Sequence, residues 1–171
     1  MNRLARASLL SAESAFAFLT RLPTPVLIVV AVIAGYAANI VAMGLVMLIA
    51  PDVPVGGPHL PLQGIGFVAA LIVACAIMPP IETFVFQWAI IVFVRRKLRW
   101  RIAWAVSVSA IAFGLAHTYS VPYMVRAAAG GLVLATVFVV EQEKRGSPFW
   151  VVTAVHAFHN LITAFALSQL V

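Results

Sequence analysis

Five long apolar runs constrain what this chain can fold into more than any other feature. They cover residues 26–50, 64–94, 102–117, 121–140 and 149–171. A helix needs about 20 apolar residues to cross a bilayer. The runs are continuous rather than alternating, which disfavours a membrane β-barrel. The sequence therefore predicts an all-α, polytopic transmembrane helical bundle. We expect about five to six membrane helices, with one proline-interrupted segment at 64–94.

The composition agrees with this prediction and excludes a soluble domain. Apolar residues make up 64% of the chain and charged residues 9%, whereas soluble domains have roughly 45–50% and 25%. We expect a single membrane domain over residues 1–171. Glu13 and Arg21 interrupt the stretch before Val26, so residues 1–25 are predicted to form an N-terminal surface helix and a lead-in to the first span.

The basic residues lie in short gaps between the apolar runs, where they set membrane topology. The gap at 95–101 holds five, the gap at 141–148 holds two, and the gap at 51–63 holds none. By the positive-inside rule, this alternation predicts a cytoplasmic N-terminus. Arg126 is the one discordant charge. We expect an integral protein of a bacterial cytoplasmic (inner) membrane, in contact with membrane lipid and not with nucleic acid.

Glu82 is the only acidic residue within any of the long apolar runs. An ionisable side chain at membrane depth is a functional-site hypothesis by default. Glu82 follows Pro79 and Pro80, which cannot both continue a helix. We expect Pro80 to begin a new helix with Glu82 in its first turn, where free N–H groups favour a carboxylate. Such an interruption requires a protein-lined or water-filled place in the bundle.

Three further polar side chains fall at a similar predicted depth: His117, His156 and Asn160. We counted residues from the basic end of each run at a rise of about 1.5 Å per residue. Glu82 then lies ~18 Å deep, His117 ~22 Å, His156 ~10 Å and Asn160 ~16 Å. His156 and Asn160 also share a helix face, because they are four residues apart. The sequence thus predicts that a carboxylate, two imidazoles and an amide meet near the midplane.

These residues, in their order, resemble a known family. Glu82 after Pro-Pro-Ile, then F-x-x-x-H at Phe113–His117, then H-x-x-x-N at His156–Asn160 is similar to the CPBP intramembrane metalloprotease family. That family includes the type II CAAX prenyl proteases and the Abi domain. The resemblance covers residues 78–162, which we interpret as the protease-like core. Each motif alone is weak evidence, but all three in order, each inside an apolar run, are strong evidence.

The first motif departs from the usual family pattern. The family usually has E-E-x-x-x-R, whereas this chain has Thr83 in place of the second glutamate and Gln87 in place of the arginine. Losing only one partner of a buried ion pair would cost about 3–5 kcal/mol. Because both partners are neutral here, we expect a Thr83–Gln87 hydrogen bond to replace the ion pair.

The resemblance implies a mechanism and a set of roles. Glu82 would be the general base that activates a water, His117 would position that water, and His156 with Asn160 would stabilise the oxyanion. Thr83, Gln87 and Phe113 would support them. The activity implied is endopeptidase cleavage of a peptide or membrane-protein substrate. A water mechanism with no required cofactor is favoured. The alternative is catalytic zinc bound by Glu82, His117 and His156, the His₂Glu set that such sites use.

Other interpretations of the same residues stay open. The chain could be a catalytically inactive membrane scaffold or a bacteriocin-immunity protein of the same fold, which the changes at Thr83 and Gln87 favour. A small transporter or proton pathway is a third possibility, although it predicts paired broken helices and only one segment is interrupted. His159 lies off the His156–Asn160 face, and we expect it to join helices by hydrogen bonds.

Overall fold

The computed structural model describes residues 13–59 and 61–169, and every regular element in those ranges is a helix. Residues 13–21 are helical and belong to the predicted surface helix, of which residues 1–12 lie outside the described part. The elements that follow are α2 (Thr24–Ile49), α3 (Gly64–Leu71), η1 (Ile72–Ile77), α4 (Met78–Glu82), η2 (Thr83–Ala89), α5 (Ile90–Arg96), α6 (Ile102–Ala116), α7 (Val121–Glu143) and α8 (Pro148–Ser168).

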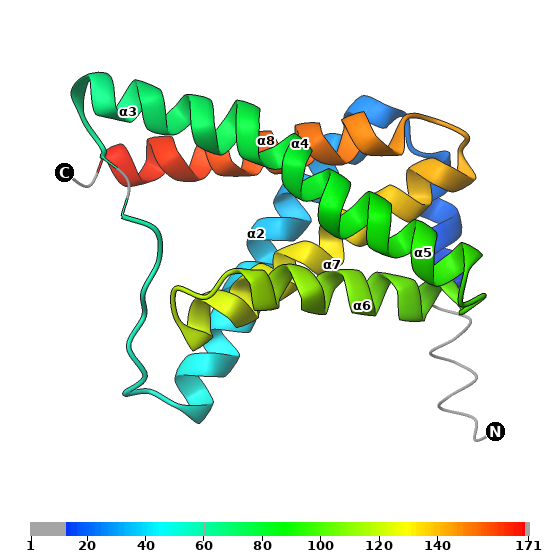
Figure 1. The fold of residues 1–171 in the computed structure, drawn as a ribbon, viewed down its shortest axis with the longest axis horizontal. Coiled ribbons are helices and arrows are strands. Elements are labelled where there is room, and N and C mark those ends of the chain that lie inside the picture. The colour runs from blue at the N-terminus through cyan, green and yellow to red at the C-terminus, as the bar shows by residue number, and fades with distance from the viewer. Residues whose placement is uncertain (1–12, 60, 170–171) are drawn as a thin grey trace.

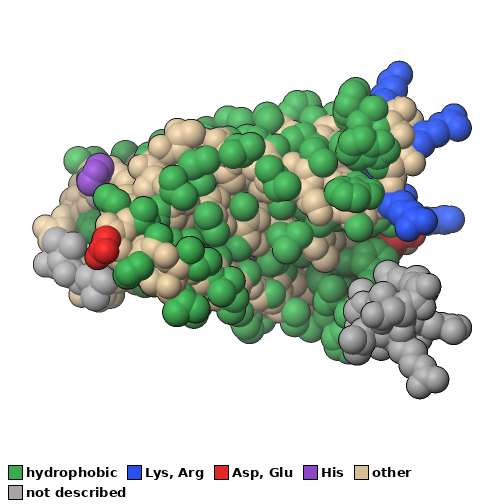
Figure 2. Space-filling model, turned by 90° about the horizontal axis from the view of Figure 1, so that it is seen from below, with side chains coloured by type: hydrophobic (Ala, Val, Ile, Leu, Met, Phe, Trp, Pro, Cys, Tyr) green, Lys and Arg blue, Asp and Glu red, His purple; other side chains and the backbone are tan. Residues whose placement is uncertain are grey.

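The helices have the length and composition of a membrane bundle. Four are long and apolar enough to cross a bilayer: α2, the continuous 64–96 helix, α7 and α8. The apolar α6 is shorter, at 15 residues. Figure 2 shows lysine and arginine side chains at one end of the visible face, and apolar side chains over the length of the molecule. The prediction of an all-helical integral membrane protein is confirmed.

Helix α7 lies at the centre of the bundle and organises the other helices. It packs against α6, α2 and α8 (Figure 1). Its second half, from Leu134 to Glu141, is almost completely buried. The small residues of α7 allow close packing, which membrane helices need because lipid supplies no hydrophobic drive between them. A Cβ on Gly114 of α6, for example, would lie only 2.6 Å from the Cβ of Ala128.

The helix that carries Glu82 continues through Pro79 and Pro80. The expectation that Pro80 begins a new helix is wrong, because α3, η1, α4, η2 and α5 follow one another without a gap from Gly64 to Arg96. The π-helical segments η1 and η2, on either side of α4, accommodate the two prolines without a break in the helix. Figure 1 shows the helix changing direction near α4. Glu82 is therefore the last residue of α4 and not part of a helix start.

A buried carboxylate fixes the turn between α7 and α8. Glu141 is 1% exposed and forms an ion pair with Lys144. Thr24, at the start of α2, donates a hydrogen bond of 3.2 Å to the same carboxylate. Gly146 packs so closely on Glu141 that a Cβ there would overlap its side chain. Since a buried charge is tolerated only when it is paired and hydrogen-bonded, these contacts hold the start of α2 against the end of α7.

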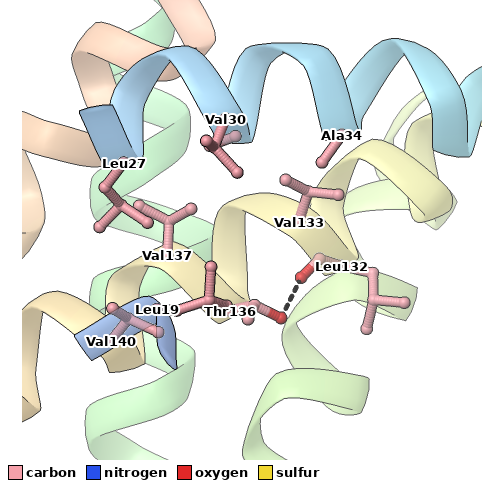
Figure 3. A pocket seen from close by; sticks show the side chains of 10 residues that line it. Leu19, Leu27, Val30, Ala34, Leu132, Val133, Thr136, Val137 and Val140 are labelled. Carbon is pink, nitrogen blue, oxygen red and sulfur yellow. Dashed lines mark hydrogen bonds between the residues drawn. The ribbon is translucent and has the colours of Figure 1, made fainter. Parts of the chain in front are cut away.

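An apolar cavity of about 220 Å³ lies between α2 and α7 (Figure 3). Its lining is aliphatic except for Thr136, whose hydroxyl bonds the Leu132 carbonyl within its own helix. None of its lining residues is titratable. The cavity therefore lacks the groups that hydrolysis requires.

Gly114→Ala tests the packing of α6 on α7. The added Cβ would lie 2.6 Å from the Ala128 Cβ and 2.7 Å from the Met124 carbonyl oxygen. We expect a loss of about 1–3 kcal/mol of stability, because backbone must shift to make room. The control is Gly44→Ala, where no atom lies within 4 Å of the new Cβ, and which should be neutral or stabilising. Thermal unfolding in detergent measures both, and equal melting temperatures would contradict the packing.

Candidate active site

The site is built around Glu82, which faces two histidines from different helices. Its Oε1 lies 4.0 Å from Nε2 of His117, and its Oε2 lies 3.5 Å from Nε2 of His156. The three side chains are 15%, 16% and 9% exposed, so they are mostly shielded but still reachable. Residues separated by 74 positions in the sequence thus meet at one carboxylate.

His117 sits at the end of α6, and its ring has a defined tautomer. It is the residue that follows α6, so its backbone leaves the helix at that point. Its Nδ1 lies 2.7 Å from the Phe113 carbonyl oxygen. Because a carbonyl can only accept, Nδ1 must carry the proton, and in the neutral ring Nε2 then presents a lone pair toward Glu82.

Phe113 contacts both histidines and holds them in place. Its ring lies 4.4 Å from the His117 ring and 5.7 Å from the His156 ring, measured between centroids. Phe113 is 4% exposed. A Cβ on Gly131 would lie 3.1 Å from the Phe113 side chain, so α7 leaves little room for it to move. The i,i+4 relation in the sequence predicted the contact with His117, but the contact with His156 required the fold.

His156 lies on α8 with one ring nitrogen toward Glu82 and the other enclosed by protein. Its Nδ1 is buried and has no hydrogen-bond partner among the described residues. The residue as a whole is 8% exposed. An unpaired buried polar atom is uncommon and calls for an explanation such as a catalytic role.

Asn160 has a structural hydrogen bond that the sequence did not predict. Its Nδ2 donates to the Ala74 carbonyl oxygen at 2.8 Å. In η1 the N–H of Met78 bonds the Val73 carbonyl, five residues back. By the same spacing the Ala74 carbonyl would pair with the backbone nitrogen of Pro79, which has no hydrogen. Asn160 therefore supplies the donor that the proline lacks, and one amide hydrogen of Asn160 remains for other partners.

Thr83 and Gln87 do not form the hydrogen bond that we expected. Both are completely buried in η2, and the Thr83 hydroxyl and both amide atoms of Gln87 lack a partner among the described residues. The i,i+4 spacing placed the two side chains near each other but did not determine the rotamer of Gln87. The prediction that a Thr83–Gln87 hydrogen bond replaces the ion pair is therefore wrong.

His159 points away from Glu82 and joins α8 to α2. Its Nε2 lies 3.2 Å from Nδ2 of Asn39, and its ring stacks on Tyr36 at 4.2 Å. The Tyr36 hydroxyl donates to the His159 carbonyl at 2.9 Å. A Cβ on Gly35 would lie 3.3 Å from the His159 ring. The structure agrees with the interpretation of His159 as a residue that joins two helices.

Sequence reasoning missed Tyr123, which packs on His117. The two rings are nearly parallel, with centroids 5.8 Å apart. The guanidinium of Arg126 lies 4.6 Å above the Tyr123 ring. The Ser120 hydroxyl caps α7 and bonds the Gly56 backbone at 3.0 and 3.1 Å, so the α2–α3 loop reaches this part of the site. The sequence spacing did not indicate this contact, because Tyr123 lies on the next helix, α7, and its distance from His117 depends on how α7 packs.

The zinc alternative requires Glu82, His117 and His156 to be arranged around one metal ion. Among residues 13–59 and 61–169, no group of three or more histidine, cysteine, aspartate or glutamate side chains is arranged to hold a metal ion. The Glu82–His117 and Glu82–His156 separations are 4.0 and 3.5 Å. We therefore derive no step through a metal.

Comparison with known families identifies the chain. A family model described as Type II CAAX prenyl endopeptidase Rce1-like matches residues 64–162. The chain belongs to this family. The match includes Glu82, His117, His156 and Asn160, and it confirms the resemblance to CAAX-type intramembrane proteases. A search of curated proteins and a search of solved structures returned no match.

Substituting Asn160 in this Rce1-like protein tests the hydrogen bond from its side chain to the Ala74 carbonyl. Asn160→Leu leaves the Ala74 carbonyl without a donor, and we expect a loss of about 1–3 kcal/mol, since an unpaired buried carbonyl carries its full desolvation penalty. Adding Pro79→Ala restores a backbone N–H beneath that carbonyl and should recover part of the loss. Unfolding of the two variants in detergent measures this. Full stability in Asn160→Leu would show that the bond is dispensable.

Proposed function

We propose that this Rce1-like protein is an intramembrane endopeptidase that hydrolyses peptide bonds of membrane-associated substrates with a water activated by Glu82 and His117. The observation that carries the proposal is the pair formed by the Glu82 carboxylate and the His117 Nε2 lone pair, 4.0 Å apart. Both atoms accept hydrogen bonds, so neither satisfies the other. A water has two protons and bridges them at about 2.8 Å from each.

The bridging water is oriented for attack on a substrate carbonyl. As its oxygen bonds to the carbonyl carbon, one proton passes to Glu82 and the C=O electron pair moves onto the carbonyl oxygen. Collapse of this tetrahedral intermediate breaks the C–N bond, and Glu82 returns the proton to the departing amine nitrogen. The products are a carboxylic acid and an amine. A positioned general base of this kind contributes about 10²–10⁴ in rate.

His156 stabilises the oxyanion. With its proton on Nε2, the ring presents a donor beside Glu82, 3.5 Å from Oε2, next to the place where the carbonyl oxygen gains charge. The remaining amide hydrogen of Asn160, not used by the Ala74 carbonyl, is the second donor. One preorganised donor is typically worth about 10²–10³ in rate.

The alternative is a membrane scaffold or immunity protein that keeps the fold without the chemistry. Thr83 and Gln87 favour it, because two buried polar side chains without a hydrogen-bond partner in the described part of the chain occupy positions that usually carry a charged pair in the family. Thr83 directly follows Glu82, and Gln87 lies in the same segment as Thr83, η2. Neither departure from the family pattern removes the Glu82 carboxylate.

A side-by-side cleavage assay decides between these functions. Wild type, Glu82→Gln and His156→Ala are incubated in proteoliposomes with a library of peptides that carry a lipid or a transmembrane anchor. We expect Glu82→Gln to lose about 10²–10⁴ in kcat and His156→Ala about 10²–10³. Both variants should retain the wild-type melting temperature to within a few degrees. Cleavage products are measured by mass spectrometry.

His59→Ala provides the control, because His59 is exposed and forms no ion pair or ring contact with Glu82, His117 or His156, and it should cleave at the wild-type rate. Each reaction is repeated with a zinc chelator. Loss of wild-type activity on chelation would show that hydrolysis depends on a metal ion and would contradict the metal-free water mechanism. If folded wild type and Glu82→Gln are equally inactive across the library, the protease proposal fails and the non-catalytic scaffold function replaces it.

A further inference from the structure

The turn between α5 and α6 holds a basic and aromatic cavity that the proposed hydrolysis does not use. The cavity has a volume of about 490 Å³ and is lined by Arg99, Trp100, Arg101 and Trp104. It lies at the end of the 64–96 helix that carries Arg95 and Arg96, and at the start of α6. Figure 2 shows that basic side chains gather at one end of the molecule.

Within residues 13–59 and 61–169, the arginines and the lysine of this turn form no ion pair. The ion pairs among the described residues involve Glu82 or Glu141, and neither pairs with any residue from Arg95 to Arg101. Membrane topology alone requires positive charge in this gap, but it does not require a concave site. A cavity with two guanidinium groups has the chemistry to bind a phosphate, because arginine forms bidentate hydrogen bonds with it.

The backbone places Arg99 at some energetic cost. Arg99 has a φ of +56°, in the left-handed region that glycine prefers and that other residues adopt infrequently. The turn is tight, with the N–H of Leu98 bonded to the Phe93 carbonyl and that of Trp100 to the Val94 carbonyl. A glycine would adopt this backbone conformation at a lower energetic cost than an arginine.

The tryptophans indicate where the cavity lies in the membrane. Trp100 and Trp104 are 49% and 61% exposed. Exposed tryptophan is characteristic of the headgroup level, where its ring is apolar and its N–H is hydrated. A ligand here meets phosphate-binding arginines and apolar rings together, as the headgroup and upper acyl region of a phospholipid would.

We propose that the cavity lined by Arg99, Trp100, Arg101 and Trp104 binds the phosphate headgroup of an anionic phospholipid. The bound lipid sits at the turn that joins the helix of Glu82 to the helix that ends at His117. The proposal does not depend on hydrolysis, so it can be tested on a protein with Glu82→Gln as well as on wild type.

Native mass spectrometry of the detergent-solubilised protein, titrated with dioleoylphosphatidylglycerol or dioleoylphosphatidylcholine, measures the site. We expect tighter binding of phosphatidylglycerol, and a loss of about thirtyfold in its affinity in Arg99→Gln/Arg101→Gln, since each of the two basic residues contributes about 1 kcal/mol near anionic lipid. The charge-matched control is Arg95→Gln/Arg96→Gln, outside the cavity lining, which should lose clearly less affinity than Arg99→Gln/Arg101→Gln.

Arg99→Gly separates binding from folding. It relieves the left-handed backbone and should keep or raise the melting temperature without lipid, while it weakens phosphatidylglycerol binding. Equal losses in the two double variants would show diffuse charge attraction and overturn the proposal. Competition by soluble glycerol phosphate at the same affinity would assign the cavity to a free phosphate ligand and overturn the lipid assignment.

Discussion

The hydrogen bond between Asn160 and the Ala74 carbonyl allows the helix that carries Glu82 to exist in its observed form. Hydrocarbon supplies no water to satisfy a free backbone carbonyl, so membrane helices with prolines must find donors from neighbouring segments. Pro79 removes one N–H from the 64–96 helix, and α8 provides a side-chain donor in its place. The π-helical turns of η1 and η2 lie on either side of the prolines, and such turns frequently occur at functional sites. One irregularity therefore bends the helix, anchors α8 to it and presents Glu82 to the histidines.

The same bond connects fold and chemistry in an unexpected way. The family resemblance implied an oxyanion role for Asn160, yet half of its donor capacity is used by the backbone. His156 and Phe113 then carry more of the site's geometry, because Phe113 contacts both imidazoles and is itself confined by Gly131. The order of the site depends on close packing between α6, α7 and α8, and small residues in α6 and α7 permit that packing.

Much of the site was predictable, because its constraints are local or depend on depth. An acidic residue in a lipid-length run is expensive unless it is functional, and residue counts placed Glu82, His117, His156 and Asn160 in one band. The unpredicted features depend on rotamers and on long-range contacts. Neither the orientation of Gln87 nor the packing of Tyr123 on His117 follows from spacing, since each depends on which neighbouring helix occupies the adjacent space.

The sequence by itself determined the membrane bundle, the approximate helix bounds, the family and the shared depth of Glu82, His117 and His156, which meet in the structure. A bilayer imposes these features directly, because it sets the length of an apolar helix and makes an isolated polar side chain costly. Only the tertiary structure decided that the helix passes through Pro79 and Pro80 without restarting, that Asn160 satisfies Ala74, and that His159 turns to α2 while His156 turns to Glu82. The physical reason is that a backbone carbonyl in lipid accepts a hydrogen bond from any donor within reach, and only the packed bundle determines which donor that is.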